Sequence, residues 1–425
     1  MSDELRIKFK QYDLDGNGKL SKKELEAAGI ANIFEGYLGG DEVSEEDFYS
    51  MMNFAAKSAG TSEKPPINHV PTMEEYNASG RYGLDLATQK PLAPELDFSN
   101  SSDLLRVTSF DDKTFSGGNK MPPGYEPQRV MELGKNPGLN IRAMQDMGYT
   151  GKGVRIAIMD WKLKPHENYD SNIINYEEMD NAKNMRNTFH GSSVTSIVVG
   201  KKTGVAPDAN VMYFAETQIS NVEQGNDMIQ ALNRVKEINA KAGDADKIRV
   251  ISISGPPYGG EEADKLIQEL NDSGTWVLTS HEFWKDFGYL EKKDPMGNPD
   301  DFDNYNVWNN GGNKDALLVN SGDRTVAGDF DDNTYRHDSV ASASWAIPVV
   351  AGLYAAACQA DPSMTPEKFK ALARESAQVR SLQTAQLKHN GNDTAELTGY
   401  SEPQPANIID AKALIQLVLQ KKNQD

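Results

Sequence analysis

The chain has 425 residues, 38% of them hydrophobic, and a net charge of −19 at neutral pH. This length exceeds what one hydrophobic core usually supports, so two or more units are expected. The acidic balance argues against binding to nucleic acid or to an anionic membrane surface. A single cysteine, Cys358, excludes an internal disulfide framework, and its alanine-rich surroundings indicate a buried thiol.

The N-terminus has no apolar segment typical of a signal peptide, and the chain has no run of about 18 apolar residues. The sequence therefore predicts a cytoplasmic protein without a membrane span, unless a route that needs no signal peptide exports it.

The composition and the hydrophobic periodicity of the sequence change twice along the chain. Residues 1–57 alternate short amphipathic helical patterns with Gly/Asp turns, and residues 58–137 are rich in Pro, Gly, Ser and Asn without clear periodicity. From residue 138 to 425, short apolar runs alternate with helical patterns. We therefore expect a small all-α unit, an irregular arm or linker, and a larger α/β domain, in that order.

Residues 13–24 (DLDGNGKLSKKE) match every position of the calcium-loop template D-x-[DN]-x-[DN]-G-x5-E. Ca²⁺ is a hard cation, and such an EF-hand loop surrounds it with oxygen ligands from positions 1, 3, 5, 7, 9 and 12. Gly18 permits the sharp turn that this geometry needs. The expected ligands are Asp13, Asp15, Asn17, Lys19 through its carbonyl oxygen, Ser21 through a water molecule, and Glu24. The simpler alternative is an acidic surface turn.

Residues 36–47 resemble a second loop of the same kind. Val43 falls at the position that pairs with Leu20 of the first loop, but Gly36, Leu38 and Gly40 stand where carboxylates would be needed. We expect residues 1–57 to form an EF-hand pair in which only the first loop binds calcium.

Five short apolar runs in the third region have the length of buried strands in a parallel sheet. They are Val154–Met159, Asn210–Phe214, Arg249–Ser254, Trp276–Ser280 and Ala316–Asn320. Helical spacing of apolar residues lies between them, at 228–238 and 263–270. This alternation predicts a doubly wound, mainly parallel α/β sheet with its functional site beyond the carboxyl ends of the strands. The Asp- and Asn-rich stretch 283–315 is expected to be a long, solvated loop, with a second calcium site or a lid over the cleft as the alternatives.

Three segments in this region carry residues suited to nucleophilic catalysis. GKGVRIAIMD ends an apolar strand with Asp160, HGSSVTSIVVG opens a helix of small residues with His190, and SASWAIPVVAG places Ser344 four residues before Pro348. Each has a plain alternative when taken alone: an aspartate that starts a turn, a structural histidine, and a serine that caps a helix.

Taken together, the three segments resemble the subtilase family of subtilisin-like serine peptidases. The family's motifs HGTHVAG…GVAP and GTSMAAPHVAG correspond to HGSSVTS…GVAP and SASWAIPVVAG here, and the resemblance spans roughly residues 136–420. It implies a catalytic triad of Asp160, His190 and Ser344, in the family's order. It also implies that Ser254, Gly255 and Pro256 line the substrate, where an extended peptide would pair with the chain.

One position departs from the family pattern. Subtilases place an oxyanion-binding asparagine in an AAGN segment after a buried strand, and counting without gaps puts Phe283 there. His281 is the candidate substitute, with a plain loop histidine as the alternative. Loss of such a donor typically costs about 10²–10³-fold in rate.

Three functions remain open on the sequence. The leading one is a serine endopeptidase that acts on peptide or protein substrates, with Ca²⁺ bound at the EF-hand as a stabiliser or regulator. The alternatives are a catalytically weak, calcium-dependent binding module of the same fold, and an esterase or amidase that acts on small substrates. Residues 58–137 are expected to form a structural arm on the catalytic domain, with a prosegment as the alternative.

Overall fold

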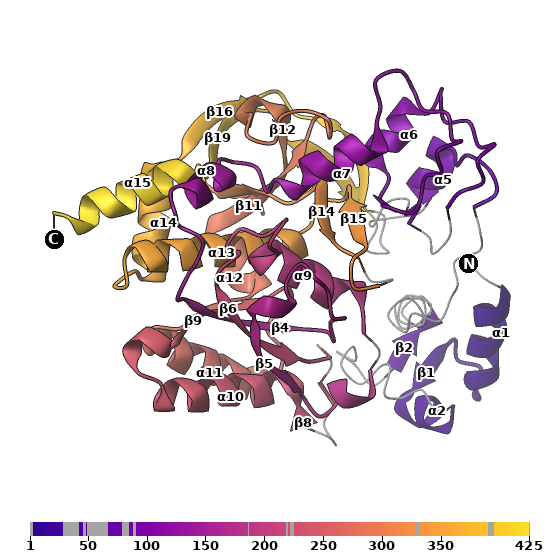
Figure 1. Cartoon of the computed structure of the whole chain (residues 1–425). Helices are drawn as coiled ribbons and strands as arrows, with labels where there is room; N and C mark the ends of the chain where they lie inside the picture. The colour runs from indigo at the N-terminus through magenta and orange to yellow at the C-terminus, as the bar shows by residue number, and fades with distance from the viewer. Residues whose placement is uncertain are drawn as a thin grey trace.

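The computed structural model describes residues 3–28, 42–45, 48, 67–78, 85–87, 91–185, 187–217, 220–221, 225–328, 331–389 and 395–424 (Figure 1). Most of the predicted second calcium loop, at 36–47, and parts of the arm lie outside the described residues.

A five-stranded parallel sheet forms the centre of the larger domain. Its spatial order is β10-β9-β4-β6-β5, and every neighbouring pair is parallel. The strands are β4 (Arg155–Asp160), β5 (Ile173–Glu178), β6 (Asn210–Ala215), β9 (Ile248–Ile253) and β10 (Trp276–Leu278). The prediction of an α/β fold with a parallel sheet is confirmed. Strand β5 was not predicted, because its side chains alternate between exposed and half-buried and therefore form no apolar run.

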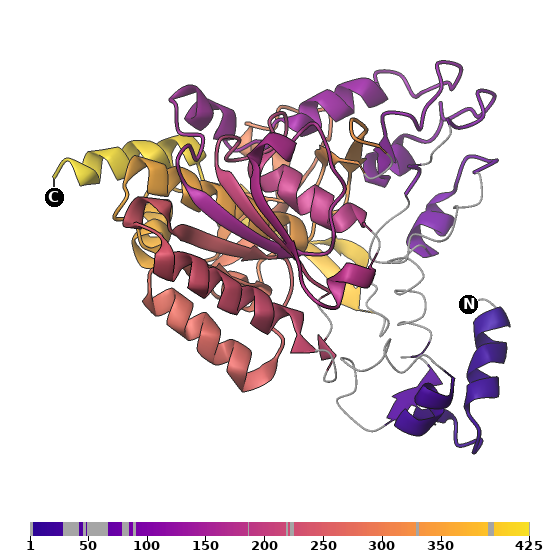
Figure 2. The ribbon, with the colours of Figure 1, turned by 60° about the horizontal axis from the view of Figure 1, so that its bottom comes forward.

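Helices cover both faces of this sheet (Figures 1 and 2). Side chains of β4 alternate between two cores: Ile156 and Ile158 pack with α9 and α13, whereas Ala157 and Met159 pack with α10 and α11. The helices are α9 (Phe189–Val199), α10 (Asp227–Lys241), α11 (Gly260–Asp272) and α13 (Ala343–Ala360). Among the described residues, only α13 is long and apolar enough to cross a membrane, and 83% of that window is buried inside the protein. It is the central helix of the core.

A second, mixed sheet has the order β12-β11-β13-β19-β16. Its strands are β11 (Phe287–Lys292), β12 (Tyr305–Asn309), β13 (Leu317–Asn320), β16 (Gln378–Leu382) and β19 (Gln404–Ile408). The expectation of one long loop over 283–315 is wrong, because the stretch contains the end of helix α12 (Ser280–Asp286) and strands β11 and β12. Phe283, Phe287 and Leu290 are fully buried and fix these elements on the core.

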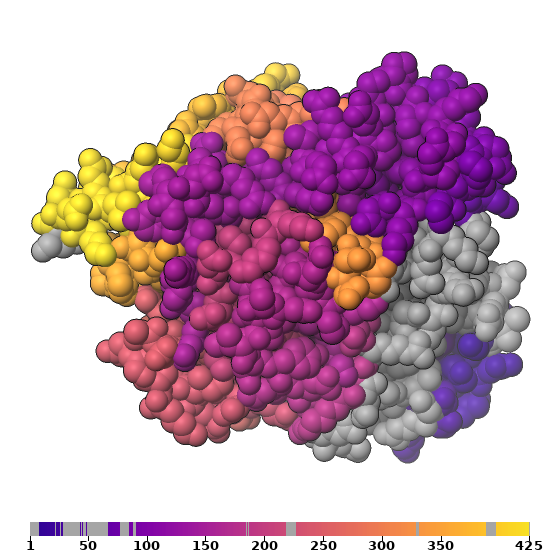
Figure 3. Space-filling view, viewed as in Figure 1, coloured from indigo at the N-terminus to yellow at the C-terminus, as the bar shows by residue number. Residues whose placement is uncertain are grey.

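The arm reaches the larger α/β domain through strand β3 (Phe110–Asp111). This strand extends the antiparallel hairpin of β14 (Arg324–Ala327) and β15 (Tyr335–Asp338), with Phe110 opposite His337. Figure 3 shows the arm as a continuous part of the molecular surface that adjoins this hairpin. Its helices are α5 (Met73–Ala78), α6 (Ser102–Val107) and α7 (Pro127–Lys135).

The remaining α-helices and β-strands of the described residues lie outside the two large sheets and the helices named above. They are α1 (Asp3–Tyr12), β1 (Lys19–Ser21), α2 (Lys22–Ala27), β2 (Glu42–Ser44), α8 (Ile141–Asp146), β7 (Ser220–Asn221), β8 (Gly225–Asn226), α14 (Pro366–Glu375), β17 (Ala385–His389), β18 (Ala395–Tyr400) and α15 (Ala411–Lys422).

Candidate active site and metal centre

Asp160 and His190 form a buried pair at the carboxyl end of the central strand. Asp160 is the last residue of β4 and is 0% exposed, and its Oδ1 lies 2.7 Å from Nδ1 of His190, the second residue of α9. Oδ1 also accepts the backbone N–H of Trp161 at 2.8 Å. These two bonds hold the carboxylate so that it orients the imidazole, whose other nitrogen, Nε2, remains for proton transfer.

The start of α9 can approach β4 because residue 191 is glycine. A Cβ atom at Gly191 would lie 2.3 Å from the carbonyl oxygen of Trp161 and 2.4 Å from the hydroxyl of Tyr213. That hydroxyl donates to the same carbonyl oxygen. The position therefore has no room for a larger residue, and this close contact seats His190 on Asp160.

The environment of His190 favours its charged form. Its side chain is 17% exposed, and the resulting burial disfavours the imidazolium. The negative charge of Asp160, its hydrogen bond and the more distant charge of Asp338 outweigh this penalty, so the pKa of His190 is raised above 6.5.

Ser344 lies in the first turn of α13, and Pro348 explains how it is held. Proline has no N–H, so the carbonyl oxygen of Ser344, four residues earlier, lacks the hydrogen bond that an α-helix normally gives it. The hydroxyl of Ser254, just beyond β9, donates to it at 3.0 Å. The Ser344–Pro348 spacing thus frees a helix carbonyl to accept this bond, which ties the backbone of Ser344 to the end of β9.

The hydroxyl of Ser344 donates to the backbone carbonyl of Ser254 at 3.3 Å. Both residues are described, and no hydrogen bond joins Ser344 to His190 in this structure. The structure therefore brings Asp160 and His190 into contact and places Ser344 at the start of α13, with its Oγ turned toward Ser254 at the end of the neighbouring strand β9. Catalytic hydrogen bonds of free enzymes often close only when substrate binds.

The position that corresponds to the family's oxyanion asparagine faces the core. Phe283 is 0% exposed, and its ring stacks on Phe287 with centroids 5.7 Å apart. His281 is exposed on the first turn of α12. The N–H of Ser280, at the start of α12, donates to the carbonyl of Gly255 at 2.9 Å, which keeps this helix end beside the Ser254 segment.

The predicted substrate edge, Ser254–Gly255–Pro256, offers few free backbone groups. Both carbonyls of the first two residues already accept hydrogen bonds, from Ser344 Oγ and from the Ser280 N–H. Pro256 and Pro257 have no N–H to donate. An extended substrate would have to share carbonyl oxygens that already accept one bond each, and it finds no N–H donor at Pro256 or Pro257.

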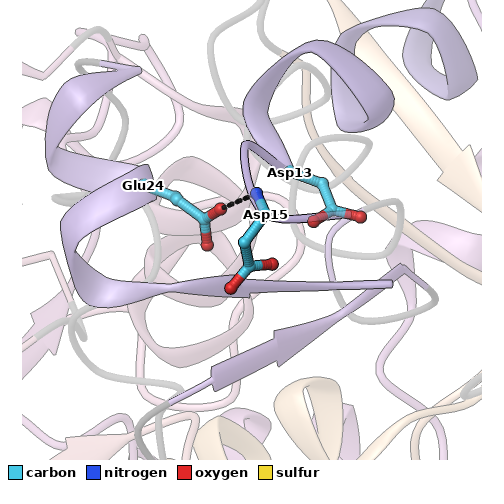
Figure 4. A group of neighbouring side chains, drawn as sticks. All are labelled: Asp13, Asp15 and Glu24. Carbon is cyan, nitrogen blue, oxygen red and sulfur yellow. Dashed lines mark hydrogen bonds between the residues drawn. The ribbon is translucent and has the colours of Figure 1, made fainter. Parts of the chain in front are cut away.

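The first predicted calcium loop brings three carboxylates together (Figure 4). Ligand atoms of Asp13, Asp15 and Glu24 all lie within 4.8 Å of one another. Gly18 has a φ of 79°, and its N–H donates to Asp13 Oδ2 at 2.9 Å, which closes the turn. Strands β1 and β2 pair with Leu20 opposite Val43, and both side chains are buried.

Glu24 closes the loop from the start of α2. Its carboxylate accepts the N–H and the hydroxyl of Ser21, at 2.8 and 2.7 Å, and the N–H of Leu14 at 2.7 Å. These bonds, led by the Ser21 N–H, lower the pKa of Glu24 to about 2. The oxygen-rich donor set fits a hard divalent cation such as Ca²⁺.

No family model matches this chain, and no curated protein matches it. Several solved structures are similar. A protease from Pseudoalteromonas arctica is 18% identical, with a TM-score of 0.43, over 69% of this chain and 98% of that one. The subtilase cytotoxin SubAB is 14% identical, with a TM-score of 0.46, over 70% of this chain and 97% of that one. A cold-adapted subtilisin-like serine proteinase is 16% identical, with a TM-score of 0.38, over 60% of this chain and 88% of that one. The neighbours are thus subtilisin-like proteases and a subtilase-fold toxin, and at this identity and TM-score no activity follows from the likeness.

Two tryptophans at the site were not singled out from the sequence. Trp161 and Trp345 directly follow Asp160 and Ser344 in the chain, and their indole rings lie 5.5 and 5.2 Å from the imidazole of His190. Their adjacency to two candidate catalytic residues is the signal that could have found them. Asp338, which binds Trp345, carried no such signal because it belongs to no motif.

Proposed function

We propose that this chain is a subtilisin-like serine hydrolase that cleaves peptide bonds with Asp160, His190 and Ser344. The observation that carries the proposal is the buried Asp160–His190 pair at the end of the central strand, one strand away from a serine at a helix N-terminus. Carboxyl ends of parallel strands are where α/β proteins assemble their sites.

The reaction begins when Ser344 Oγ turns from Ser254 toward Nε2 of His190. Oγ attacks the substrate carbonyl carbon while its proton passes to Nε2, and the carbonyl π electrons move to the oxygen. The C–N bond then breaks, and the proton on Nε2 goes to the leaving amine. A water molecule, deprotonated by His190 in the same way, hydrolyses the acyl-enzyme and regenerates Ser344.

The backbone N–H of Ser344 is a candidate donor for the oxyanion. The first hydrogen bonds of α13 run from Trp345 and Ala346 to the Ser342 carbonyl, so the N–H of Ser344 precedes the helical ladder. The positive end of the helix dipole favours negative charge at the same place. His281 remains the second candidate donor, by its place at the start of α12.

We further propose that residues 13–24 bind Ca²⁺ through Asp13, Asp15, Asn17, Lys19, Ser21 and Glu24. The ion would neutralise the clustered carboxylates and stabilise the N-terminal module as an EF-hand, while the catalytic residues carry out the reaction without it.

A second candidate is a hydrolase of small esters or amides. The lack of donors at Pro256 and Pro257 favours it, because a protease of this type usually holds an extended peptide by backbone pairing. The same triad would act on both kinds of substrate.

Fluorophosphonate treatment followed by intact-mass analysis tests the triad. We expect one adduct that maps to Ser344 and disappears in Ser344→Ala. Turnover of a mixed peptide library against a series of short-chain aryl esters then separates the two candidates. No adduct and no turnover, with and without calcium, would reject both and favour a binding module.

A further inference from the structure

We propose that Asp338 is a positioning residue of the active centre, which holds Trp345 against His190 and is itself held by Ser109 of the arm. The inference rests on the proposed hydrolase function. The proposal makes the arm a part of the active centre, because the hydroxyl of Ser109 begins the series of contacts that runs through Asp338 and Trp345 to His190.

Asp338 is a buried carboxylate with a full set of donors. It is 5% exposed, and its Oδ2 accepts the indole N–H of Trp345 at 3.2 Å. Its Oδ1 accepts the hydroxyl of Ser109 at 3.1 Å and the N–H of Val340 at 3.3 Å. A buried carboxylate requires such compensation, and these bonds leave the indole of Trp345 little freedom to turn.

Trp345 in turn packs against the catalytic imidazole. Its ring centroid lies 5.2 Å from that of His190, with 34° between the planes. Trp161 lies on His190 as well, at 5.5 Å and 48°, and is fixed by a bond from its indole N–H to the Thr217 carbonyl at 3.1 Å. Contacts with two anchored indoles restrict rotation of the imidazole, and their electron-rich faces favour its protonated form.

The arm reaches this assembly through several independent bonds. Ser109 is fully buried, and its hydroxyl also accepts the N–H of Ser339 at 3.1 Å. The Ser339 hydroxyl donates to the Val107 carbonyl at 2.9 Å, and Phe110 pairs with His337 in the β3–β15 ladder. An arm that completes the hydrogen bonding of Asp338 belongs to the mature catalytic unit, which argues against its removal as a prosegment.

Asp338 also acts on the charge of His190. The charged groups that act on the imidazole are Asp160 from β4 and Asp338 from β15. Arg336 lies over the neighbouring ring of Phe189 at 5.6 Å, and its Nε is 4.0 Å from Oδ2 of Asp338. Both carboxylates raise the pKa of His190. Neutralising Asp338 should therefore lower this pKa, an effect that a purely structural role would not produce.

The test compares Asp338→Asn and Ser109→Ala with wild-type protein and with the control Ser116→Ala. Ser116 belongs to the same arm, and its hydroxyl bonds only within it, to Asn119 at 3.1 Å. We expect Asp338→Asn to shift the acid limb of fluorophosphonate inactivation down by roughly 0.5–1 pH unit. Ser109→Ala should lower the inactivation rate severalfold, and Ser116→Ala should match wild type.

A double-mutant cycle of Asp338→Asn with Trp345→Phe shows whether the two residues act through their shared hydrogen bond or independently of each other. Phenylalanine keeps a ring on His190 but has no N–H for Asp338, so the two rate losses should be clearly less than additive. Additive losses, or an unshifted acid limb in a folded Asp338→Asn protein, would overturn the proposal.

NMR titration of the His190 imidazole gives a readout independent of catalysis. If the wild-type protein takes up no fluorophosphonate, the hydrolase proposal fails, yet a lower His190 pKa in Asp338→Asn would still support the contact chain. An unchanged His190 pKa would reject it whatever the activity. Thermal unfolding of each variant verifies that it is folded.

Discussion

The two halves of the candidate active centre are built in different ways. Asp160 and His190 come from β4 and the start of α9, and one direct 2.7 Å contact joins them against the central sheet. The Ser344 half depends on segments far apart in the chain, among them Ser254 after β9 and Ser109 in the arm. The first half therefore inherits the rigidity of the sheet, whereas the second depends on side-chain bonds that substitution can remove one at a time.

The largest effect should come from breaking the first half. Asp160→Asn keeps the shape of the side chain but replaces the carboxylate with a neutral amide, which holds the imidazole less firmly and no longer compensates the positive charge that the imidazole takes up. We expect kcat to fall by about 10³–10⁴-fold with the protein still folded. A loss below tenfold would show that Asp160 does not orient the base, and would leave Asp338 as the main carboxylate partner.

Phe283→Asn tests whether an asparagine at position 283 can serve as the oxyanion donor that this position supplies in subtilases. Because Phe283 is fully buried among aromatic rings, the substitution should destabilise the protein by about 3–5 kcal/mol without raising kcat. Phe283→Leu is the matched control and should cost much less, since it remains apolar. A rise in kcat for Phe283→Asn would mean that this side chain reaches the cleft.

The difference between the halves also explains how far the sequence could predict them. Asp160 at a strand end, His190 at a helix start and the Ser344–Pro348 spacing are local patterns, and the structure places the first two in contact. Residues 283–315 were mistaken for a loop because their composition is dominated by Asp and Asn, although buried apolar and aromatic residues, such as Phe283, Phe287 and Tyr305, decide their structure. Ser109 and Asp338 could not be paired from sequence, because they lie 229 positions apart and their bond depends on how the arm folds back.

Removing calcium should destabilise the N-terminal module without affecting either half of the candidate active centre. We expect saturating Ca²⁺, at about a hundred times its Kd, to stabilise the module by about 2.7 kcal/mol and to raise its unfolding midpoint in calorimetry. Glu24→Gln should abolish this gain, whereas Glu74→Gln, an exposed change outside the loop, should keep it. A calcium-dependent gain that survives Glu24→Gln would place the ion elsewhere.

Ser254→Ala removes the hydroxyl that donates to the Ser344 carbonyl, in place of the helical N–H that Pro348 lacks. It leaves the Ser344 carbonyl without its donor, and we expect a loss of about 1–2 kcal/mol in unfolding free energy. Adding Pro348→Ala returns a helical N–H to that carbonyl, so the double variant should recover part of the loss. If the double variant is no more stable than Ser254→Ala, the hydroxyl is not what replaces the missing helical bond.

The smallest expected effect is a dependence of activity and stability on pH that comes from the raised pKa of His190. In the proposed mechanism His190 must be neutral to accept the Ser344 proton. Because the pKa of His190 is raised above 6.5, the acid limb of kcat/KM should have its midpoint above pH 6.5. The same shift acts on stability in the opposite sense. A raised folded-state pKa stabilises the fold below about pH 6.5, its unfolded value, and this contribution is lost as pH rises through the folded-state pKa. Activity should thus rise over the window in which this stabilisation fades. Unfolding midpoints of wild type and His190→Gln, measured across that window, should converge with increasing pH, and a constant difference between them would contradict the assigned charge of His190.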